Sequence, residues 1–329
     1  MTITGNLDVG YQSFDFKVNK VTNSAGSNGS STTAIFFRDT EDLGGGLKVN
    51  FQYEIDPALS ETSSRTVGTS ATGTTSNVTS SLGNGQSFVE LAGGFGAIKL
   101  GTPNLPTLAA NGQGNSGFAT AIGSGYRVTS FDAVSFQNSL RYDSPSFMGL
   151  TVGYLQSAKN DKQSLPGTLG QTGNLQNQTN GRDQATEISL TYAQGPLTVR
   201  YADLQMKQWA DVALVGAATA GTQTTNKFDR KAQGIYAAYY VMPKVKLMVN
   251  MVTAKNGAAH VGSGATTAAN KQTKVTGLGA DYEFSKRTAG YFCTETNKDD
   301  AGMRSITGYT AATGNTTYKA TAIGIRHTF

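Results

Sequence analysis

Apolar and polar residues alternate with a period of two through most of the chain. Near the N-terminus Ile3, Leu7, Val9 and Tyr11 are separated by polar or small residues, and a polar stretch then extends to about Ser31. A period of two places successive side chains on opposite faces of a β-strand. The same pattern recurs to Phe329 and predicts fourteen strands, with the polar stretch before Ser31 as a loop.

The predicted connections alternate between short turns and long polar segments. Leu43–Leu47 and Gln194–Pro196 are examples of the short turns, and both contain glycine. The long segments, rich in Gly, Ser, Thr and Asn, cover 16–31, 56–86, 158–183, 208–230, 255–272 and 297–316. Short turns at one end and long loops at the other are typical of bacterial outer-membrane barrels. We therefore predict an all-β chain in which residues 1–329 form a single closed antiparallel transmembrane barrel.

One connection, residues 102–136, has no sustained period although it lies between two predicted strands. A loop of this length without secondary structure is usually functional. We predict that it folds into the lumen and narrows the pore. Phe118, Tyr126 and Phe131 either pin this loop to the wall, which is the favoured interpretation, or form an apolar patch that contacts solutes.

Composition excludes several other classes of protein. Lys and Arg number 27 against 22 Asp and Glu, a formal charge of +5 that is scattered along the chain. Scattered charge of this size does not predict a nucleic-acid binder, and it favours anions only slightly. No apolar run approaches the roughly 18 residues of a transmembrane helix, and a membrane barrel produces no such run. We expect any targeting segment to have been removed, because the first predicted strand begins at Thr2.

The residues that carry most catalytic and metal chemistry are sparse. Cys293 is the single cysteine, and His260 and His327 are the two histidines, so no intrachain disulfide and no zinc site are expected. Gly112–Gly117 fits G-x-G-x-x-G, but no helix is predicted after it, as a dinucleotide site requires. We therefore expect no metal, no cofactor and no enzymatic activity.

Five segments, in order along the whole chain, resemble the general porins of β-proteobacteria and Neisseria. The segments are Arg38–Lys48, Gln86–Gly96, Leu140–Phe147, Gly279–Thr288 and Gly324–Phe329. The resemblance implies a homotrimer of water-filled barrels in the outer membrane, with the third outer loop folded inward. It also implies sixteen strands, two more than the pattern predicts.

The resemblance also bears on single positions. It implies that the C-terminal Phe329 is the signal for membrane insertion. Members of the family usually carry basic residues in the second strand and just before the fourth, where this chain has Ala34, Gly85 and Gln86. These departures argue against strong anion selectivity.

Following the alternation inward places charged side chains on the predicted lumen wall, near the short-turn end. They either form a ring that sorts ions by sign or are solvated charges that pair with each other. The candidate pore-lining and constriction residues are Asp8, Arg38, Lys99, Arg127, Asp132, Arg141, Asp143, Arg200, Asp281, Glu283 and Arg326.

Together these features predict a passive diffusion porin for small hydrophilic solutes and ions, with a weak preference for anions. Its expected partners are outer-membrane lipid, lipopolysaccharide and the solutes themselves. The alternative is a barrel-anchored adhesin or binding protein whose long outer loops contact other molecules.

Overall fold

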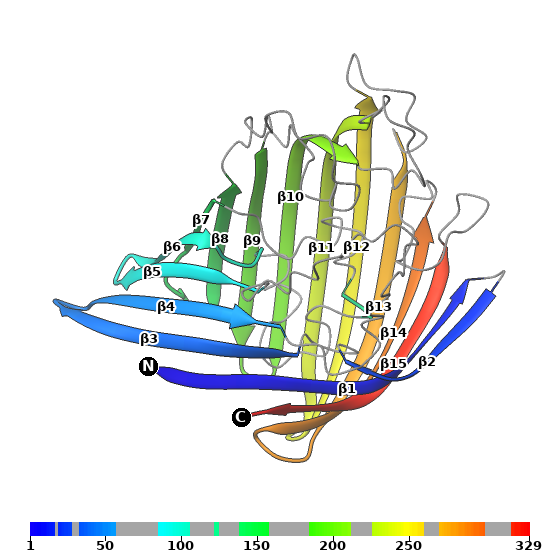
Figure 1. The fold of residues 1–329 in the computed structure, drawn as a ribbon, viewed down its shortest axis with the longest axis horizontal. Helices are drawn as coiled ribbons and strands as arrows, with labels where there is room; N and C mark the ends of the chain where they lie inside the picture. The colour runs from blue at the N-terminus through cyan, green and yellow to red at the C-terminus, as the bar shows by residue number, and fades with distance from the viewer. Residues whose placement is uncertain are drawn as a thin grey trace, which may run out of the picture.

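The computed structural model describes residues 1–16, 19–27, 33–56, 85–105, 122–124, 138–157, 184–211, 226–259, 270–299 and 317–329. Within these ranges the chain forms fifteen β-strands and no helix (Figure 1). Accordingly, the described part of the chain contains no helix long and apolar enough to cross a membrane.

The strands follow one another along the chain. They are β1 (Thr2–Phe16), β2 (Asn19–Ser27), β3 (Ala34–Gly44), β4 (Leu47–Ile55), β5 (Ser87–Gly93), β6 (Gly96–Thr102), β7 (Ser139–Asp143), β8 (Leu150–Ser157), β9 (Gln184–Gln194), β10 (Leu197–Asp211), β11 (Asn226–Met242), β12 (Val245–Ala259), β13 (Gln272–Glu283), β14 (Thr288–Asp299) and β15 (Tyr318–Thr328).

All fifteen strands belong to one sheet that closes on itself. From β3 to β15 each strand pairs with the next in sequence, and β15 then pairs antiparallel with β1. The β1–β15 register runs from Asn6↔Thr328 to Asp15↔Lys319. Closure satisfies the backbone hydrogen bonds of the first and last strands, which lipid could not do.

β2 and β3 share one position in the wall. β3 pairs with Thr2–Asn6 of β1, and β2 pairs with Val9–Phe16 along the same edge. The wall therefore has fourteen strand positions, which confirms the count predicted from the pattern. The prediction of a loop up to Ser31 is wrong for Asn19–Ser27, which form the strand β2. The backbone groups of β1 beyond Asn6 need partners, and this main-chain pairing overrides the polar composition of the segment.

The sixteen strands implied by the resemblance are not found. The extra pair would fall near 208–230, between β10 and β11. These two strands instead pair directly with each other, from Leu197↔Tyr239 as far as Asp211↔Asn226. Their ladder therefore leaves no place in the wall for another hairpin.

The two faces of the wall differ as the alternation predicts. Ile235, Leu278 and Ile323 lie on the outer face, where about half of each side chain is exposed. Ala202 and Ala232 lie on the inner face and are 1% exposed. The inner face also carries buried apolar residues, such as Leu204 and Val252, beside its polar and charged ones. The apolar outer face is the arrangement of a barrel surrounded by lipid.

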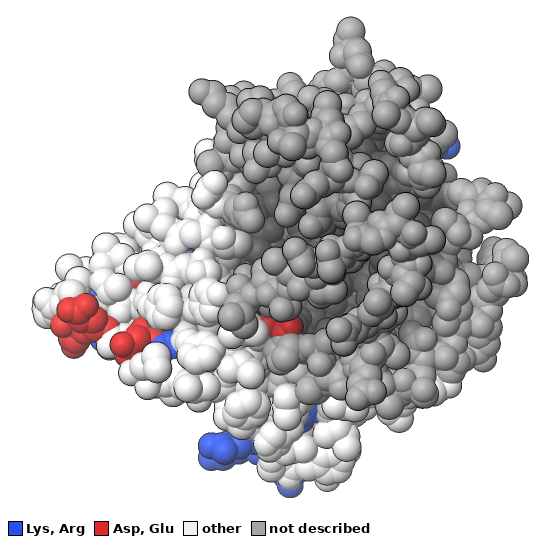
Figure 2. Space-filling view, viewed as in Figure 1, with Lys and Arg blue, Asp and Glu red and all other residues white. Residues whose placement is uncertain are grey.

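The short turns and both chain termini lie at the same rim (Figure 1). The β3–β4 turn contains Gly44, Gly45 and Gly46, whose φ angles of 80°, 60° and 81° explain the need for glycine there. In Figure 2 acidic atoms gather at the tip of this hairpin, and basic atoms lie near the β13–β14 turn.

Replacing Leu278 with Arg tests the assignment of the outer face. Leu278 lies near the middle of the outward face of β13, where a lipid-facing Arg costs about 2–4 kcal/mol. We expect the Leu278→Arg variant to insert poorly into lipid vesicles and to unfold at a lower denaturant concentration. Thr276→Arg, one outward position nearer the outer rim, should cost less because the penalty falls toward the interface. Equal stability of Leu278→Arg and the unchanged protein would contradict the assignment.

Candidate pore lining and constriction

Five inward residues form a buried group at the closure of the barrel, here called the seam cluster: Asp8, Lys246, Asp281, Tyr291 and Arg326. Asp281 Oδ2 accepts hydrogen bonds from Lys246 Nζ at 2.9 Å and from Arg326 Nη2 at 3.0 Å. The Tyr291 hydroxyl donates to Asp8 Oδ1 at 2.7 Å. The sequence predicted three of these residues and missed Lys246 and Tyr291. The inward parity of β12 and β14 could have found both.

A second charged group lies on β5, β6 and β7 and is here called the hairpin cluster. Lys99 Nζ lies 3.3 Å from Glu90 Oε2 and 3.2 Å from Asp143 Oδ2. Arg141 Nη2 lies 2.8 Å from Asp143 Oδ1, and Arg141 Nε also donates to this carboxylate. Glu90 was missed, although it stands directly opposite Lys99 in the sheet register. Acids and bases are thus paired in both clusters.

The remaining predicted charges that the structure describes make contacts with neutral groups. Arg38 donates to Gln52 Oε1 at 2.8 Å and to Thr4 Oγ1 at 3.0 Å. The guanidinium carbon of Arg200 lies 5.8 Å from the centre of the Tyr236 ring.

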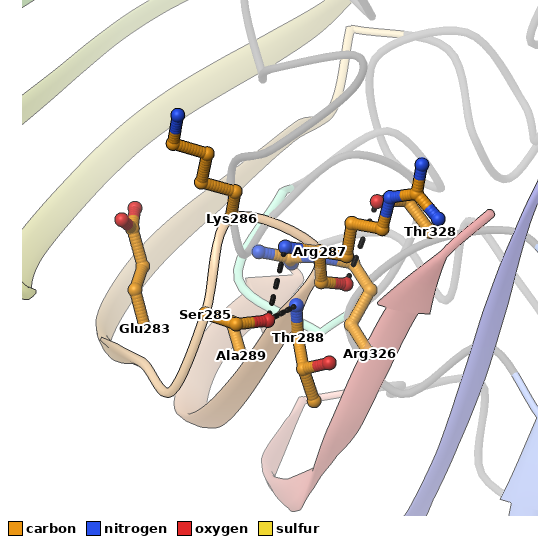
Figure 3. Close-up of a pocket in the computed structure, with 8 residues that line it drawn as sticks. All are labelled: Glu283, Ser285, Lys286, Arg287, Thr288, Ala289, Arg326 and Thr328. Atoms are coloured by element: carbon orange, nitrogen blue, oxygen red, sulfur yellow. Dashed lines mark hydrogen bonds between the residues drawn. The ribbon is translucent and has the colours of Figure 1, made fainter.

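Glu283 lies at the short-turn rim, where it accepts a hydrogen bond from the Tyr240 hydroxyl at 2.5 Å. It borders a small hollow beside the β13–β14 turn (Figure 3). Three basic side chains, Lys286, Arg287 and Arg326, line the same hollow. Ser285 Oγ accepts hydrogen bonds from the backbone amides of Arg287 and Thr288 and so holds the turn. The hollow is therefore lined by more positive than negative groups.

The long segment after β6 is attached to the inner face of the wall where it begins. Arg141 Nη1 donates to the carbonyl of Asn104 at 2.9 Å, and the Asn104 amide donates to Gln86 Oε1 at 3.2 Å. Gln86 Nε2 in turn donates to Glu54 Oε2 at 2.9 Å. Leu105 follows and is 1% exposed, in an apolar cluster with inward residues of β8 to β13.

Residues 122–124 belong to the same segment and contact a different part of the wall. The Gly123 amide donates to Glu295 Oε2 of β14 at 2.8 Å. Asn250 Nδ2 of β12 donates to the carbonyls of Gly123 and Ser124 at 3.0 and 2.6 Å. Gly277 of β13 lies against them, and a Cβ there would overlap with the backbone of Gly123. The described parts of the segment therefore contact β12, β13 and β14 as well as β7 and Gln86, the residue before β5.

Several predicted residues lie outside the residues that the structure describes. They are Phe118, Tyr126, Arg127, Phe131, Asp132, His260 and the Gly112–Gly117 motif. Their predicted roles stay predictions.

The positions where basic residues were expected are closely packed. Ala34 is 1% exposed, and Gln86 is 6% exposed beside the Glu54 carboxylate. A Cβ at Gly85 would overlap with the Glu54 side chain. None of these three sites has open space for a basic side chain without rearrangement.

Phe329 lies on the outer face at the barrel closure. Its amide and carbonyl exchange hydrogen bonds with Gly5 at 3.0 Å, and its ring covers Gly5 so closely that a Cβ there would overlap with it. His327 is exposed on the same face, with Nδ1 3.0 Å from Thr288 Oγ1. These contacts attach the C-terminus to the wall, and the role of Phe329 in insertion stays a prediction.

One carboxyl group beyond the outer end of β4 has a perturbed pKa. Burial raises the pKa of Asp56 to about 7, and the negative charge and hydrogen bond of Glu54 act in the same direction. An ordinary Asp pKa is about 3.9. Asp56 therefore changes charge near neutral pH, close to the residues that hold the start of the long segment.

A closed antiparallel barrel with an apolar outer face and a charged inner face is a transmembrane β-barrel. Residues 1–322 match the model of the Gram-negative porin family. The major outer membrane protein P.IB of Neisseria gonorrhoeae is 27% identical over 364 residues, covering 100% of this chain and 94% of that protein. P.IB of Neisseria lactamica is 27% identical over 310 residues, covering 90% and 82%.

Among solved structures, an anion-selective porin from Comamonas acidovorans shares the fold, with a TM-score of 0.62 and 22% identity. The alignment covers 100% of this chain and 99% of that one. The chain belongs to the Gram-negative porin family. It is an outer-membrane channel, and proteins of this class are channels rather than enzymes.

Substitution of Gly277 tests whether the 122–124 segment is held against the wall. Gly277→Ala should displace this segment because the added Cβ overlaps with the Gly123 carbonyl. We expect single-channel conductance in a planar bilayer to change in mean or in noise. Gly234→Ala is the matched control, since its added Cβ would meet the Val252 side chain at 3.3 Å. A Gly277→Ala channel indistinguishable from the control would contradict the attachment.

The pKa of Asp56 leads to a pH dependence. The carboxyl group is neutral below pH about 7 and negative above it, so any preference for anions should decrease between pH 6 and pH 8. Reversal potentials in a salt gradient measure this change. Asp56→Asn should remove the pH dependence, whereas Asp42→Asn, an exposed residue near the β3–β4 turn, should retain it. An unaltered pH response in Asp56→Asn would show that another group titrates.

Proposed function

We propose that the channel conducts small hydrophilic solutes by passive diffusion, with a weak preference for anions. The observation that carries this proposal is the pairing of acids with bases on the inner wall. Lys99, Arg141 and Arg326 each contact a carboxylate, so their positive charges are largely offset. The basic lining of the hollow at the β13–β14 turn and the formal charge of +5 favour anions. The Comamonas acidovorans neighbour is described as anion-selective.

The charged residues predicted on the lumen wall, from Asp8 to Arg326, are proposed as the charged wall of the pore. Lys99 and Asp143 are partly exposed, whereas Asp8, Asp281 and Arg326 are buried. In a water-filled lumen at physiological salt, the field of a charged side chain is screened over a Debye length of about 8 Å. Paired charges at such distances resemble dipoles, whose field falls faster than that of a single charge. A weak selectivity that decreases as salt rises is the consequence.

Residues 102–136 are proposed as the constriction. Support comes from the two parts of this segment that the structure describes. Asn104 is bound at the inner face of β7, and Gly123 is bound at β12 and β14. Attachment of both described parts to the inner wall supports the proposal that the segment reduces the open cross-section of the pore.

Assembly and lipid contacts complete the proposal. We propose a homotrimer, as the family resemblance implies, and one related structure is described as a trimer form. Outer-membrane lipid and lipopolysaccharide are the proposed partners of the apolar outer face. This face carries exposed Leu, Ile, Val and Phe on many strands, which water would not favour.

Conductance of the purified protein in a planar bilayer tests the function. Stable, stepwise single-channel currents with a small reversal potential toward anions are expected. A barrel that inserts but carries no current would support the alternative, a barrel-anchored adhesin or binding protein.

Charge reversal at Lys99 tests the origin of selectivity. Lys99→Glu leaves Glu90 and Asp143 without their shared counter-charge and adds a third carboxylate, so the preference should turn toward cations at 0.1 M salt and shrink at 1 M. Lys286→Glu, the same charge change on the exposed β13–β14 turn, should have a smaller effect. Lys99→Gln, a milder change, should shift the reversal potential in the same direction. No shift in either folded Lys99 variant would contradict a pore-lining role.

A further inference from the structure

Among the residues whose side chains the structure describes, one lysine occupies the outward face of each strand from β10 to β15. We call this set the lysine row. Its members are Lys207, Lys231, Lys255, Lys274, Lys298 and Lys319, and all six are exposed. No lysine or arginine occupies the outward positions in the outer halves of the described parts of β4 to β9. The row therefore covers one side of the barrel.

The lysine row lies at a single level. Each lysine is nine to eleven residues from the end of its strand that faces the short turns or the C-terminus. At a rise of about 3.3 Å per residue and a tilt near 40°, this places the row roughly 23–28 Å above that rim. The apolar band of an outer-membrane barrel is about 25 Å tall. The row is thus at the outer edge of the membrane, where lipid headgroups begin.

The order of outward residues below the lysines is the same on neighbouring strands. On β12 the apolar Met251 is followed by Thr253 and Lys255, and on β13 Leu278 is followed by Thr276 and Lys274. The remaining strands place Gln205, Gln233, Thr296 and Thr321 directly below their lysines. On β11, β12, β13 and β15 apolar, uncharged polar and cationic residues follow in this order, as do the hydrocarbon, glycerol and phosphate layers of a lipid leaflet. On β10 and β14 the polar residues Asp203 and Thr294 come before the apolar layer.

Sheet register brings like charges together in this row. Lys231 stands directly opposite Lys255, and Lys274 stands directly opposite Lys298. Directly opposed like charges destabilise a sheet. The repulsion is relieved if anions lie between the lysines, which a row of lipid phosphates would provide.

Acidic neighbours offset only part of the row. Asp203 Oδ2 lies 3.2 Å from Lys231 Nζ, Asp15 is opposite Lys319 in the register, and Asp229 is exposed on β11. Within the described part of the chain, Lys255, Lys274 and Lys298 form no ion pair. The central part of the row is therefore the strongest positive region of this face.

We propose that the lysine row binds the phosphate groups of anionic lipids in the outer leaflet, with Lys255, Lys274 and Lys298 as its centre. The proposed surface continues directly from the apolar band that contacts the acyl chains, so one lipid molecule can use both. The proposal rests on the outer-membrane location of the barrel and does not depend on its conductance or selectivity.

Binding of lipid A to the full-length barrel in detergent micelles tests this proposal, with native mass spectrometry to count bound lipid. The triple variant Lys255→Gln, Lys274→Gln, Lys298→Gln should bind about a hundredfold more weakly, a factor of roughly five for each lysine near an anionic headgroup. The control triple variant Lys48→Gln, Lys244→Gln, Lys286→Gln removes the same charge from exposed positions near the short turns. It should bind as the unchanged protein does.

Additional variants and lipids in the same binding experiment identify the ligand. Lys→Arg changes at the same three positions keep the charge and should retain binding, which separates charge from folding. Lipid A without its phosphates should bind weakly to every variant. Unchanged binding in the Lys→Gln triple, equal loss in the control triple, or displacement of lipid by low millimolar inorganic phosphate would each overturn the proposal. Conductance of the Lys→Gln triple in neutral lipid should equal that of the unchanged protein, which keeps this test separate from the channel function.

Discussion

The structure depends on the hydrogen-bonded pairing of its first and last strands. A backbone amide or carbonyl without a partner in hydrocarbon costs several kcal/mol, so an open β1 or β15 edge would leave a row of unfavourable groups. Pairing from Asn6↔Thr328 to Asp15↔Lys319 removes that edge. The remaining strands are then stable in lipid because each already has two neighbours.

Side chains at this closure reinforce the backbone pairing. Gly10 and Gly324 stand opposite each other, and a Cβ on either would overlap with the hydroxyl of Tyr291. The aromatic ring can therefore pass from β14 over β15, and its hydroxyl reaches Asp8 on β1. Covering glycines with an aromatic ring is a known way to pin sheet register. The Tyr291 side chain therefore contacts β15 and β1 as well as belonging to β14.

The inner wall shows how a barrel can carry many charges without a strong field. Asp281 forms ion pairs with both Lys246 and Arg326, and Asp143 forms ion pairs with both Lys99 and Arg141. Burial makes an unpaired charge costly, and pairing avoids this cost. The same pairing limits the net charge presented to a passing ion. Stability of the lumen wall and the proposed weak selectivity thus have one physical origin.

The sequence alone determined the strand count, the closed barrel and the face to which most side chains point. The reason is that a period of two is a local property, and the contrast between lipid and water imposes it on every strand. Asp8, Lys99, Arg141 and Asp281 could be placed on the inner face for this reason. The positions of most short turns followed from glycine and proline, whereas the β13–β14 turn at Ser285–Arg287 contains neither.

Only the tertiary structure decided which inward residues meet. Lys246 reaches Asp281, and Glu90 reaches Lys99, because of sheet register, which period alone does not specify. The polar residues of β2 form a strand because β1 offers them backbone partners, against their local preference. The contacts of Gly123 with β12 and β14 likewise join residues more than a hundred positions apart. Such contacts arise from closure of the whole sheet, and no local pattern encodes them.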